Sequence, residues 1–555
     1  MKNKLILGTL FLTITGFITR IIGFFYRIFL SNALGARLLG VYQLIFPVYG
    51  ICFTLFASGI QTAISKQVAE REATGGIHGT RRILRAGSLL SFTSALLTSV
   101  LVFFGAPFLA DTLLKEPECA KSLRILALAF PLCGITSCIH GYCFGLKKSF
   151  LPATSQLAEQ SMRVVFLYTV SVSIPVTCEL AIAALVLGEL ASCLYCVIGN
   201  QLLHRKQKKA EELSSAIKEN PPGGQISNNR QSETGSTKTA SHTNKSKETF
   251  PINHSGQNIV LPAHTPKKER YVLKKLLLMS LPLTTNRLFI NILHSFEAFL
   301  VPLTLRRFGL SRDEALSIFG ILSGMTMSFL MFPGTLTNSL SVLLLPVVSE
   351  SAARDNIRAL SRSTAAAVKY SVLLGICAGF AFFFFGKELG ITVFSEERAG
   401  IYLVNLSFLC PFLYVSTTFS SILNGLGKMN LTFLSSVLGL SLRVVLFATL
   451  IPRLGIYGYF VSLLISQFFL TLLELILVKK SIRFPFDAVN TLLKPSLILL
   501  ATASFFLRLY EFLAAQTAFP HLLLLALCGC LFTLSVLLLF FAAGVCKRGE
   551  LSGTQ

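Results

Sequence analysis

Apolar stretches long enough to cross a membrane follow one another along almost the whole chain. A transmembrane helix needs about 20 consecutive, mostly apolar residues. A window of that length finds stretches over residues 5–31, 39–66, 83–110, 121–146, 151–174, 179–203, 272–304, 315–348, 363–386, 400–426, 430–451, 455–478, 489–510 and 520–545. The pattern therefore predicts an all-α integral membrane protein with about 14 transmembrane helices.

The composition excludes a soluble protein. Of the 555 residues, 53% are hydrophobic and only 14% are charged, and the mean hydropathy is +0.67. This is more apolar surface than one globular core buries, so the surplus is expected to face lipid. The start MKNK and the apolar run after it resemble a secretory signal, but no small-residue cleavage pattern follows. We therefore expect an uncleaved first helix.

One long polar segment divides the predicted helices. Residues 204–270 are rich in Ser, Thr, Asn, Gly and Lys and contain almost no aromatic residues. This composition predicts a disordered, basic cytoplasmic loop. The loop separates an N-terminal lobe of six helices, residues 1–203, from a C-terminal lobe of six helices, residues 271–480. Residues 481–555 hold the last two helices and a cytoplasmic tail.

Lysine and arginine gather in the even-numbered connections between the predicted helices. These residues are Lys66, Arg71, Arg81, Arg82, Arg85, Lys147, Lys148, Arg205, Lys206, Lys208, Lys209, Arg354, Arg358, Arg362, Lys428, Lys479, Lys480 and Arg483. The positive-inside rule then predicts a multi-pass protein of the cytoplasmic (inner) membrane with both termini in the cytoplasm. The net charge of +24 comes mostly from these cytoplasmic connections, where it sets the orientation of the helices and attracts anionic membrane lipids. We therefore expect no nucleic-acid partner.

The chain contains an internal repeat. A shift of 280 residues places Gly145–Leu167 on Gly425–Phe447, with identical residues at Gly145, Leu146, Lys148, Leu151, Ser155, Ser161, Arg163, Val164 and Val165. The offset corresponds to six membrane crossings, so both copies run in the same direction. We expect two parallel six-helix lobes with a cavity between them, an arrangement typical of alternating-access transporters, plus two C-terminal helices outside the symmetry.

Two arginines lie inside the first predicted helix. Arg20 is about 20 Å from the start of that helix at 1.5 Å per residue, which is too deep to reach the surface easily. Arg27 follows two turns later on the same face but lies closer to the helix end, where its side chain could snorkel. We expect both arginines to face a polar cavity.

The seventh predicted helix carries a polar stripe. Arg287, Asn291 and His294 follow at spacings of four and three, so they share one face, and Glu297 lies three residues further on. Polar residues in such a position usually face a protein interior or a substrate path. We expect Arg287 and Asn291 to bind substrate, while Glu297 neutralises an arginine or contributes a ligand.

The fifth predicted helix carries Glu159 and Arg163 at positions i and i+4, a spacing that favours an internal ion pair. The second copy of the repeat keeps Arg443 but has Gly439 in place of the glutamate. Arg443 is therefore free of a local partner and available to a substrate or to a neighbouring helix. Both arginines could instead fix the geometry of the repeats.

Deep arginines outnumber deep acids, which favours an anionic substrate group such as a phosphate or pyrophosphate. A drug or organic-cation exporter would need buried acids beside aromatic residues. We find no nucleotide-binding or hydrolase motif, and the CxxC of Cys193 and Cys196 lies in an apolar run without a second pair. We therefore expect no enzyme activity, no cofactor and no metal, and transport driven by an ion gradient or the substrate's own gradient.

Five stretches of the sequence together resemble a known family. They are GTLFLTITGFITRIIGFFYRIFLSNALG, AISKQVAE at 63–70, GYCFGLKKSFLPATSQLAEQSMR at 141–163, GELAS at 188–192 and SLPLTTNRLFIN at 280–291. They are similar to the stage V sporulation protein B branch of the polysaccharide-biosynthesis flippases. That branch belongs to the multidrug/oligosaccharidyl-lipid/polysaccharide exporter superfamily, which also includes the lipid II flippases.

The resemblance implies a flippase for undecaprenyl-pyrophosphate-linked sugars, such as precursors of cell wall, spore cortex or polysaccharide. In the related lipid II flippases, arginines of the first helix contact the pyrophosphate. Arg20 matches the first of them, and Arg27 is one residue out of step with the second. An arginine expected in the eighth helix is missing from residues 315–348, so Arg287 is its candidate substitute.

Two other functions remain open at this stage. One is an ion-coupled small-molecule or drug antiporter of the same fold, and the other is a membrane scaffold or sugar-transfer enzyme. The expected partners are the lipid-linked sugar, anionic membrane lipids and cell-wall synthesis proteins.

Overall fold

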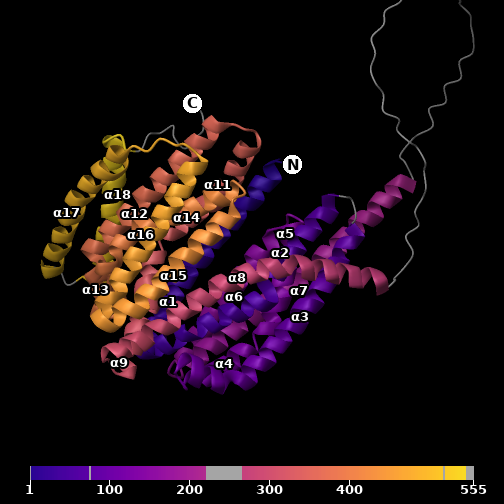
Figure 1. The fold of residues 1–555 in the computed structure, drawn as a ribbon, viewed down its shortest axis with the longest axis horizontal. Helices are drawn as coiled ribbons and strands as arrows, with labels where there is room; N and C mark the ends of the chain where they lie inside the picture. Colours follow the sequence, from indigo (N-terminus) through magenta and orange to yellow (C-terminus); the bar gives the residue numbers. More distant parts are fainter. Residues whose placement is uncertain (1, 74–76, 220–265, 517–518, 546–555) are drawn as a thin grey trace, which may run out of the picture.

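The computed structural model describes residues 2–73, 77–219, 266–516 and 519–545, and these residues form helices and no strand (Figure 1). The first half contains α1 (Lys2–Phe53), η1 (Thr54–Ser58), α2 (Gly59–Ala73), α3 (Ile77–Phe108), η2 (Leu109–Leu114), α4 (Cys119–Ala127), α5 (Phe130–Gly145), α6 (Phe150–Ser171) and α7 (Cys178–Glu219). The second half contains α8 (Pro266–Phe308), α9 (Arg312–Gly320), η3 (Ile321–Thr326), α10 (Met327–Met331), α11 (Gly334–Ala353), α12 (Ile357–Phe394), α13 (Glu397–Leu406), η4 (Ser407–Leu409), α14 (Cys410–Gly425), α15 (Met429–Leu454) and α16 (Ile456–Ser481). The chain continues into η5 (Val489–Leu493), α17 (Lys494–Gln516) and α18 (His521–Ala542).

Within the described residues, 12 helices are long and apolar enough to cross a membrane, or up to 13 if the bent pair α4 and α5 forms one span. The outer surface of the bundle is apolar. Phe104 and Val172, for example, are 76% and 79% exposed. Side chains of this kind are matched to lipid and not to water. The chain is a multi-pass integral membrane protein, and the predicted all-α membrane fold is confirmed.

The number of spans depends on how the breaks in the helices are counted. Residues 14–72 form one continuous candidate span where the sequence predicted two helices. The predicted helix over 315–348 is instead divided after Met331, and α6 is not among the candidate spans because it includes many polar residues. The predicted 14 helices and the observed 12 or 13 therefore describe similar segments divided at different places.

Gly35 folds α1 back on itself. Its backbone has φ 72° and ψ 171°, a conformation that favours glycine because it has no Cβ. Before this point, the Arg27 guanidinium contacts Ser328, and after it Pro47 accepts a hydrogen bond from Ser295. The two arms of α1 therefore run in opposite directions and contact different parts of the second half.

The second arm of α1, after Gly35, packs closely against α9 and η3. A Cβ added at Gly40 would lie 2.2 Å from the Leu316 carbonyl oxygen, and one added at Gly320 would lie 2.1 Å from the Ala36 oxygen. Small residues allow helix backbones to approach in this way within a membrane. This crossing joins the first half of the chain to the second.

The internal repeat predicted from the sequence is present in the structure. Helix α5 covers residues 130–145 and α14 covers residues 410–425, so both bounds differ by 280. Each helix has a proline in its first turn and ends at a leucine with nearly the same φ and ψ. In each half the following helix pairs closely with the next one, α6 with α7 and α15 with α16.

The segment predicted as a disordered loop, 204–270, is helical at both of its described ends. Helix α7 continues to Glu219, and α8 begins at Pro266. The run AEELSSAIKE near the end of α7 contains mostly good helix formers, which explains the extension. Residues 220–265 lie outside the described residues.

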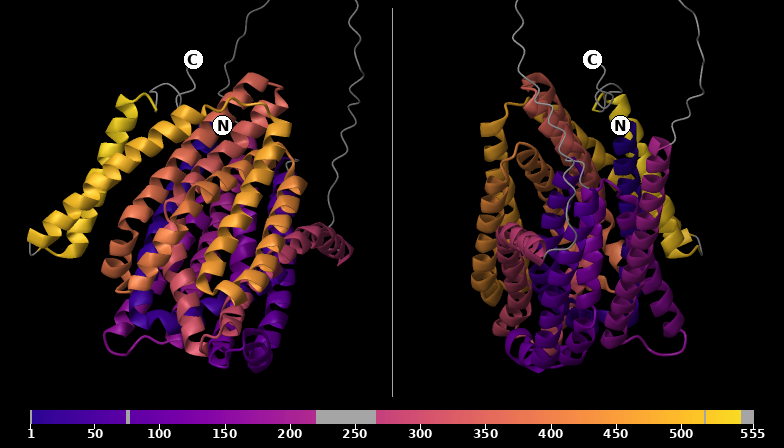
Figure 2. Two further views of the ribbon diagram at one scale, coloured as in Figure 1. Left: turned by 60° about the vertical axis from the view of Figure 1, so that its left-hand side comes forward. Right: turned by 90° about the vertical axis from the view of Figure 1, so that its right-hand side faces the viewer.

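Helices α17 and α18 lie at one side of the bundle. They pack against each other and contact the rest of the protein mainly through α12 (Figure 2). The start of α1 and the end of α18 lie near one edge in Figure 1, and α4 and α9 lie at the opposite edge. Helices α17 and α18 therefore extend the second half without covering the junction between the halves.

Ion pairs join the two halves at the edge formed by α4 and α9. The Glu116 carboxylate is fully buried and accepts hydrogen bonds from Arg306 and, at 2.7 Å, from Arg312 Nε. Arg37, just after the fold of α1, pairs with Glu118 at 2.6 Å and with Asp313 at 2.7 Å. The connections before α4 and before α9 are therefore held together by charge, and this edge of the bundle is closed.

We expect Gly40→Ala to destabilise the protein by about 1–3 kcal/mol because the new methyl group would overlap the α9 backbone. Thermal unfolding in detergent, followed by circular dichroism, measures this. The matched control is Gly16→Ala in the same helix, since a Cβ there has no neighbour within 4 Å. Equal melting temperatures for the two variants would contradict the close crossing.

We expect Glu116→Gln to lower the free energy of unfolding by about 1–3 kcal/mol, because two arginines lose their shared carboxylate. Glu118→Gln should cost less than about 1 kcal/mol, since the Glu118 side chain is 44% exposed. Denaturation midpoints of both variants at low and high salt test this prediction. A larger loss for Glu118→Gln would show that the buried carboxylate is not the main tie.

Candidate functional site

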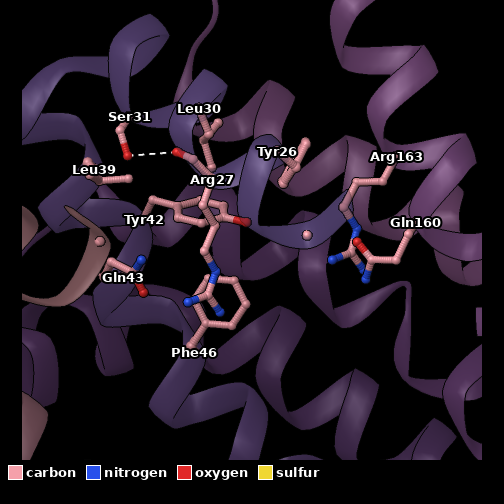
Figure 3. A pocket seen from close by; sticks show the side chains of 12 residues that line it. Tyr26, Arg27, Leu30, Ser31, Leu39, Tyr42, Gln43, Phe46, Gln160 and Arg163 are labelled. Carbon is pink, nitrogen blue, oxygen red and sulfur yellow. Dashed lines mark hydrogen bonds between the residues drawn. The ribbon is translucent and has the colours of Figure 1, made fainter. Parts of the chain in front are cut away.

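A cavity of about 300 Å³ lies in the fold of α1. The residues that line it are Gly23, Tyr26, Arg27, Leu30, Ser31, Leu39, Tyr42, Gln43, Phe46, Gln160, Arg163 and Gly324. Most come from the two arms of α1, and the others come from α6 and η3 (Figure 3). The cavity therefore lies mainly in the first half and meets the second half at η3.

Local sequence explains why space remains here. The fold at Gly35 brings Leu39–Phe46 back beside Tyr26–Ser31, and Gly23 and Gly324 add no side chain to the space between them. Gly324 belongs to η3, a π-helical segment, and such segments occur often at functional sites. A sharp reversal and small residues thus create a polar recess inside a membrane bundle.

Two arginines define the chemistry of the cavity. The Arg27 guanidinium makes a 3.3 Å hydrogen bond to the Ser328 hydroxyl, and no carboxylate lies within 4.0 Å of it among the described residues. Arg163 Nη2 donates to Glu159 Oε1 at 2.6 Å, while its buried Nε has no hydrogen-bond partner among those residues. Both side chains keep N–H donors available, and no acidic residue lines the cavity.

Neutral polar groups complete the lining. Figure 3 shows Gln43 and Phe46 beside the Arg27 side chain, with Gln160 next to Arg163. Tyr26 and Tyr42 also line the cavity. An anion in this space would meet fixed donors and two positive charges.

The structure places Arg20 outside this cavity. Its Nη1 atom lies 3.4 Å from the Thr335 carbonyl oxygen of α11, and the side chain is exposed. Arg20 and Arg27 are seven residues apart on the first arm of α1, or about 10 Å along the helix. Both face the second half of the chain, but only Arg27 lines the cavity.

Arg287 and Asn291 are also not brought to the cavity. Arg287 Nη1 donates to the Ser58 carbonyl oxygen at 2.7 Å, and Asn291 Nδ2 donates to Thr54 Oγ1 at 2.5 Å. Ser295, one turn further, donates to the Pro47 carbonyl oxygen at 3.2 Å. The polar stripe of α8 is therefore a ladder of hydrogen bonds to α1 and the π-helical η1.

Glu297 and Arg443 form an ion pair between α8 and α15. Arg443 Nη1 lies 3.3 Å from Glu297 Oε1, and Arg443 also donates to Ser466 and Gln467 of α16. His294 lies 3.5 Å from the same carboxylate. The arginine that lacks a local partner in the sequence thus obtains one from a distant helix, and Glu297 neutralises it.

The sequence reasoning missed several groups of this region. Tyr42, Gln43 and Gln160 are polar residues within apolar runs, but no local pattern separates them from ordinary packing residues. Among the described residues, no three His, Cys, Asp or Glu side chains gather as a metal site, and Cys193 and Cys196 are free thiols. The cavity is therefore described by its arginines and its neutral donors.

Comparison with known proteins shows what the chain is similar to. Residues 5–218 match the family described as "Polysaccharide biosynthesis protein". The chain is 25% identical over 486 residues to stage V sporulation protein B of Bacillus subtilis (strain 168), an alignment that covers 86% of this chain and 84% of that protein. It is also 27% identical over 175 residues to the lipid II flippase MurJ of the same organism, covering 30% of this chain and 32% of MurJ.

The fold agrees with these relatives. A structure of the lipid II flippase MurJ in an inward closed conformation superposes with a TM-score of 0.63 at 13% sequence identity, covering 96% of this chain and 99% of MurJ. Sequence and fold thus agree: residues 5–218 are similar to the polysaccharide biosynthesis proteins, and nearly the whole chain has a fold like that of the lipid II flippase MurJ.

Proposed function

We propose that this chain is a flippase that carries undecaprenyl-pyrophosphate-linked sugars from the cytoplasmic to the outer leaflet of the cytoplasmic membrane. The observation that carries the proposal is the cavity in the fold of α1, which offers Arg27 and Arg163 and no acidic lining residue. The names of its relatives, a sporulation protein and a lipid II flippase, are consistent with a cell-wall, spore-cortex or polysaccharide precursor.

The guanidinium groups suit a phosphate or pyrophosphate. Arginine presents paired N–H donors that match two phosphate oxygens, and it stays protonated at any physiological pH. Among the described residues the Arg27 guanidinium bonds only to the Ser328 hydroxyl, so an anion would meet little competition for it. Arg163 shares its charge with Glu159, so the pyrophosphate would compete with that carboxylate.

The arrangement of the two halves supports alternating access between two six-helix lobes, 1–203 and 271–480. Ion pairs close the edge formed by α4 and α9, and the cavity meets η3 of the second half. Rearranging these pairs would open the cavity toward the other side of the membrane. With the basic connections facing the cytoplasm, both termini would lie there, and the closed edge would face outward.

The other residues predicted to bind substrate would act around this cavity. Arg20 would meet the anionic group on its way to Arg27, while Arg287 and Asn291 would hold α8 against α1 until substrate replaces their bonds. A drug antiporter would need acidic groups in the cavity, and its lining contains none. Cell-wall synthesis proteins would receive the translocated precursor.

We expect Arg27→Ala and Arg163→Ala each to reduce outer-leaflet exposure of a labelled lipid-linked precursor by about tenfold or more, because each removes a charge-assisted hydrogen bond to the phosphate. The assay uses cells depleted of their other flippases and several precursors. Arg354→Ala is the matched control, since that side chain is 69% exposed and pairs only with Glu350 on its own helix. Normal exposure in both cavity variants would refute the proposed site.

Arg20→Ala and Arg287→Ala should both reduce flipping but differ in stability. Arg287→Ala removes two bonds to Ser58 and should lower the melting temperature by several degrees, whereas Arg20→Ala removes one 3.4 Å bond and should leave it unchanged. Melting curves and the leaflet-exposure assay on the same preparations measure both effects. Full flipping by both variants would remove these residues from the substrate path.

A further inference from the structure

Glu474 is a buried carboxylate that the proposed substrate path does not use. It lies on α16, where it is 1% exposed, and its carboxylate is placed between α14 and α16. The Ser416 hydroxyl donates to Oε2 at 2.5 Å, and the Ser420 hydroxyl donates to Oε1 at 2.7 Å. Both serines belong to α14, one turn apart, so a single carboxylate bridges the two helices.

No basic group neutralises Glu474. Among the described residues, no Lys, Arg or His nitrogen lies within 4.0 Å of its carboxylate, and only the two serine hydroxyls act on it. The helices packed against α14 and α16 also carry Arg358, Arg362, Lys369, Glu388 and Arg453, and α16 itself carries Lys479 and Lys480, but no ion pair within 4.0 Å joins any of them to Glu474 among the described residues. Other charged side chains of these helices form ion pairs elsewhere. These pairs are Glu350 with Arg354, Lys387 with Glu397, Arg398 with Glu396, and Arg443 with Glu297.

The other buried carboxylates of the bundle differ in this respect. Glu159, Glu297 and Glu116 each pair with an arginine. Glu189 lacks a basic nitrogen within 4.0 Å but lies beside the Tyr49 hydroxyl, 3.4 Å away, in the region of the Glu159–Arg163 pair. Glu474 is therefore the carboxylate most isolated from positive charge within the described part of the chain.

An ionised carboxylate in such a place costs several kcal/mol, and a bound proton removes that cost. Serine hydroxyls can donate to a carboxylate or accept from a carboxylic acid, so the same three side chains satisfy both forms. Each carboxylate oxygen already accepts a hydrogen bond from one serine hydroxyl, as expected of a hydrogen-bonded acid or carboxylate. The geometry suits a proton better than Na⁺.

Packing of the helix pair alone does not require this carboxylate. The 280-residue repeat places His140 of α5 at the position of Ser420. His140 contacts Ser155 at 2.8 Å and the Cys196 thiol of α7 at 3.4 Å. The matching helix pair of the first half is thus held at this position without an acid.

Glu474 also lies close to one end of its helix. Helix α16 ends at Ser481, seven residues later and about 10 Å away along the helix. Lys479 and Lys480 in its last turn are exposed. A short opening between α14 and α16 would therefore connect the carboxylate to water on one side of the membrane.

We propose that Glu474 is a proton-binding site of the second half and that its proton is taken up and released during the transport cycle. This inference rests on the proposed flippase function. Release leaves a carboxylate that keeps both serine bonds and passes the proton to water near the end of α16. Uptake restores the neutral acid before the site is buried again, so a proton gradient biases the cycle.

The first test needs no substrate. Purified protein in lipid is titrated while the C=O band of protonated carboxyl groups is followed by infrared difference spectroscopy. Glu474→Gln should remove one titrating band, whereas Glu474→Asp should keep it at a shifted position. An unchanged band in Glu474→Gln, or its loss only in Glu189→Gln, would overturn the assignment.

The second test measures outer-leaflet exposure of the labelled precursor in proteoliposomes with imposed gradients. A pH gradient should change the rate severalfold for the wild type and for Glu388→Gln, a control on α12, but should have no effect on Glu474→Gln. A retained pH response in Glu474→Gln, or a response to a Na⁺ gradient alone, would overturn the proposal. If the wild type moved no lipid-linked precursor, the flippase function would fail, and the infrared titration would still decide the proton site.

Discussion

The neutralisation of charge inside the membrane is the constraint on which the rest of this structure depends. An isolated charge in the bilayer interior costs several kcal/mol, so each deep arginine needs a carboxylate or a set of oxygen acceptors. Arg163 meets Glu159 on its own helix, and Arg443 meets Glu297 on another. These pairs determine which helices stay together and which donors remain for a ligand.

The two halves satisfy this constraint differently, although they repeat each other in sequence. In the first half the ion pair is local, at i and i+4 on α6, and it lies beside the cavity. In the second half Gly439 occupies the place of the glutamate, and α8 supplies the acid instead. The repeat therefore keeps the arrangement of these helices, while Arg163 of the first half lines the cavity and Arg443 of the second half is not among its lining residues.

Glycine residues also determine how α1 folds and how it packs against the second half. The reversal at Gly35 places two antiparallel arms of one helix against each other and leaves the cavity between them. The close crossing of Gly40 and Gly320 then brings the second half near enough for Ser328 to contact Arg27. In the proposed transport cycle, rearrangement of these contacts between the halves would carry the substrate across.

By itself, the sequence determined the class of protein and the 280-residue repeat of α5 and α14, because run lengths and register are local properties of the chain. Only the tertiary structure decided which arginines line the cavity. Arg27 and Arg163 line it, whereas Arg287 donates a hydrogen bond to Ser58. Arg443 pairs with Glu297, 146 residues away in the sequence. These pairings depend on how the helices rotate and pack against one another, and the periodicity of one helix cannot specify the face of another.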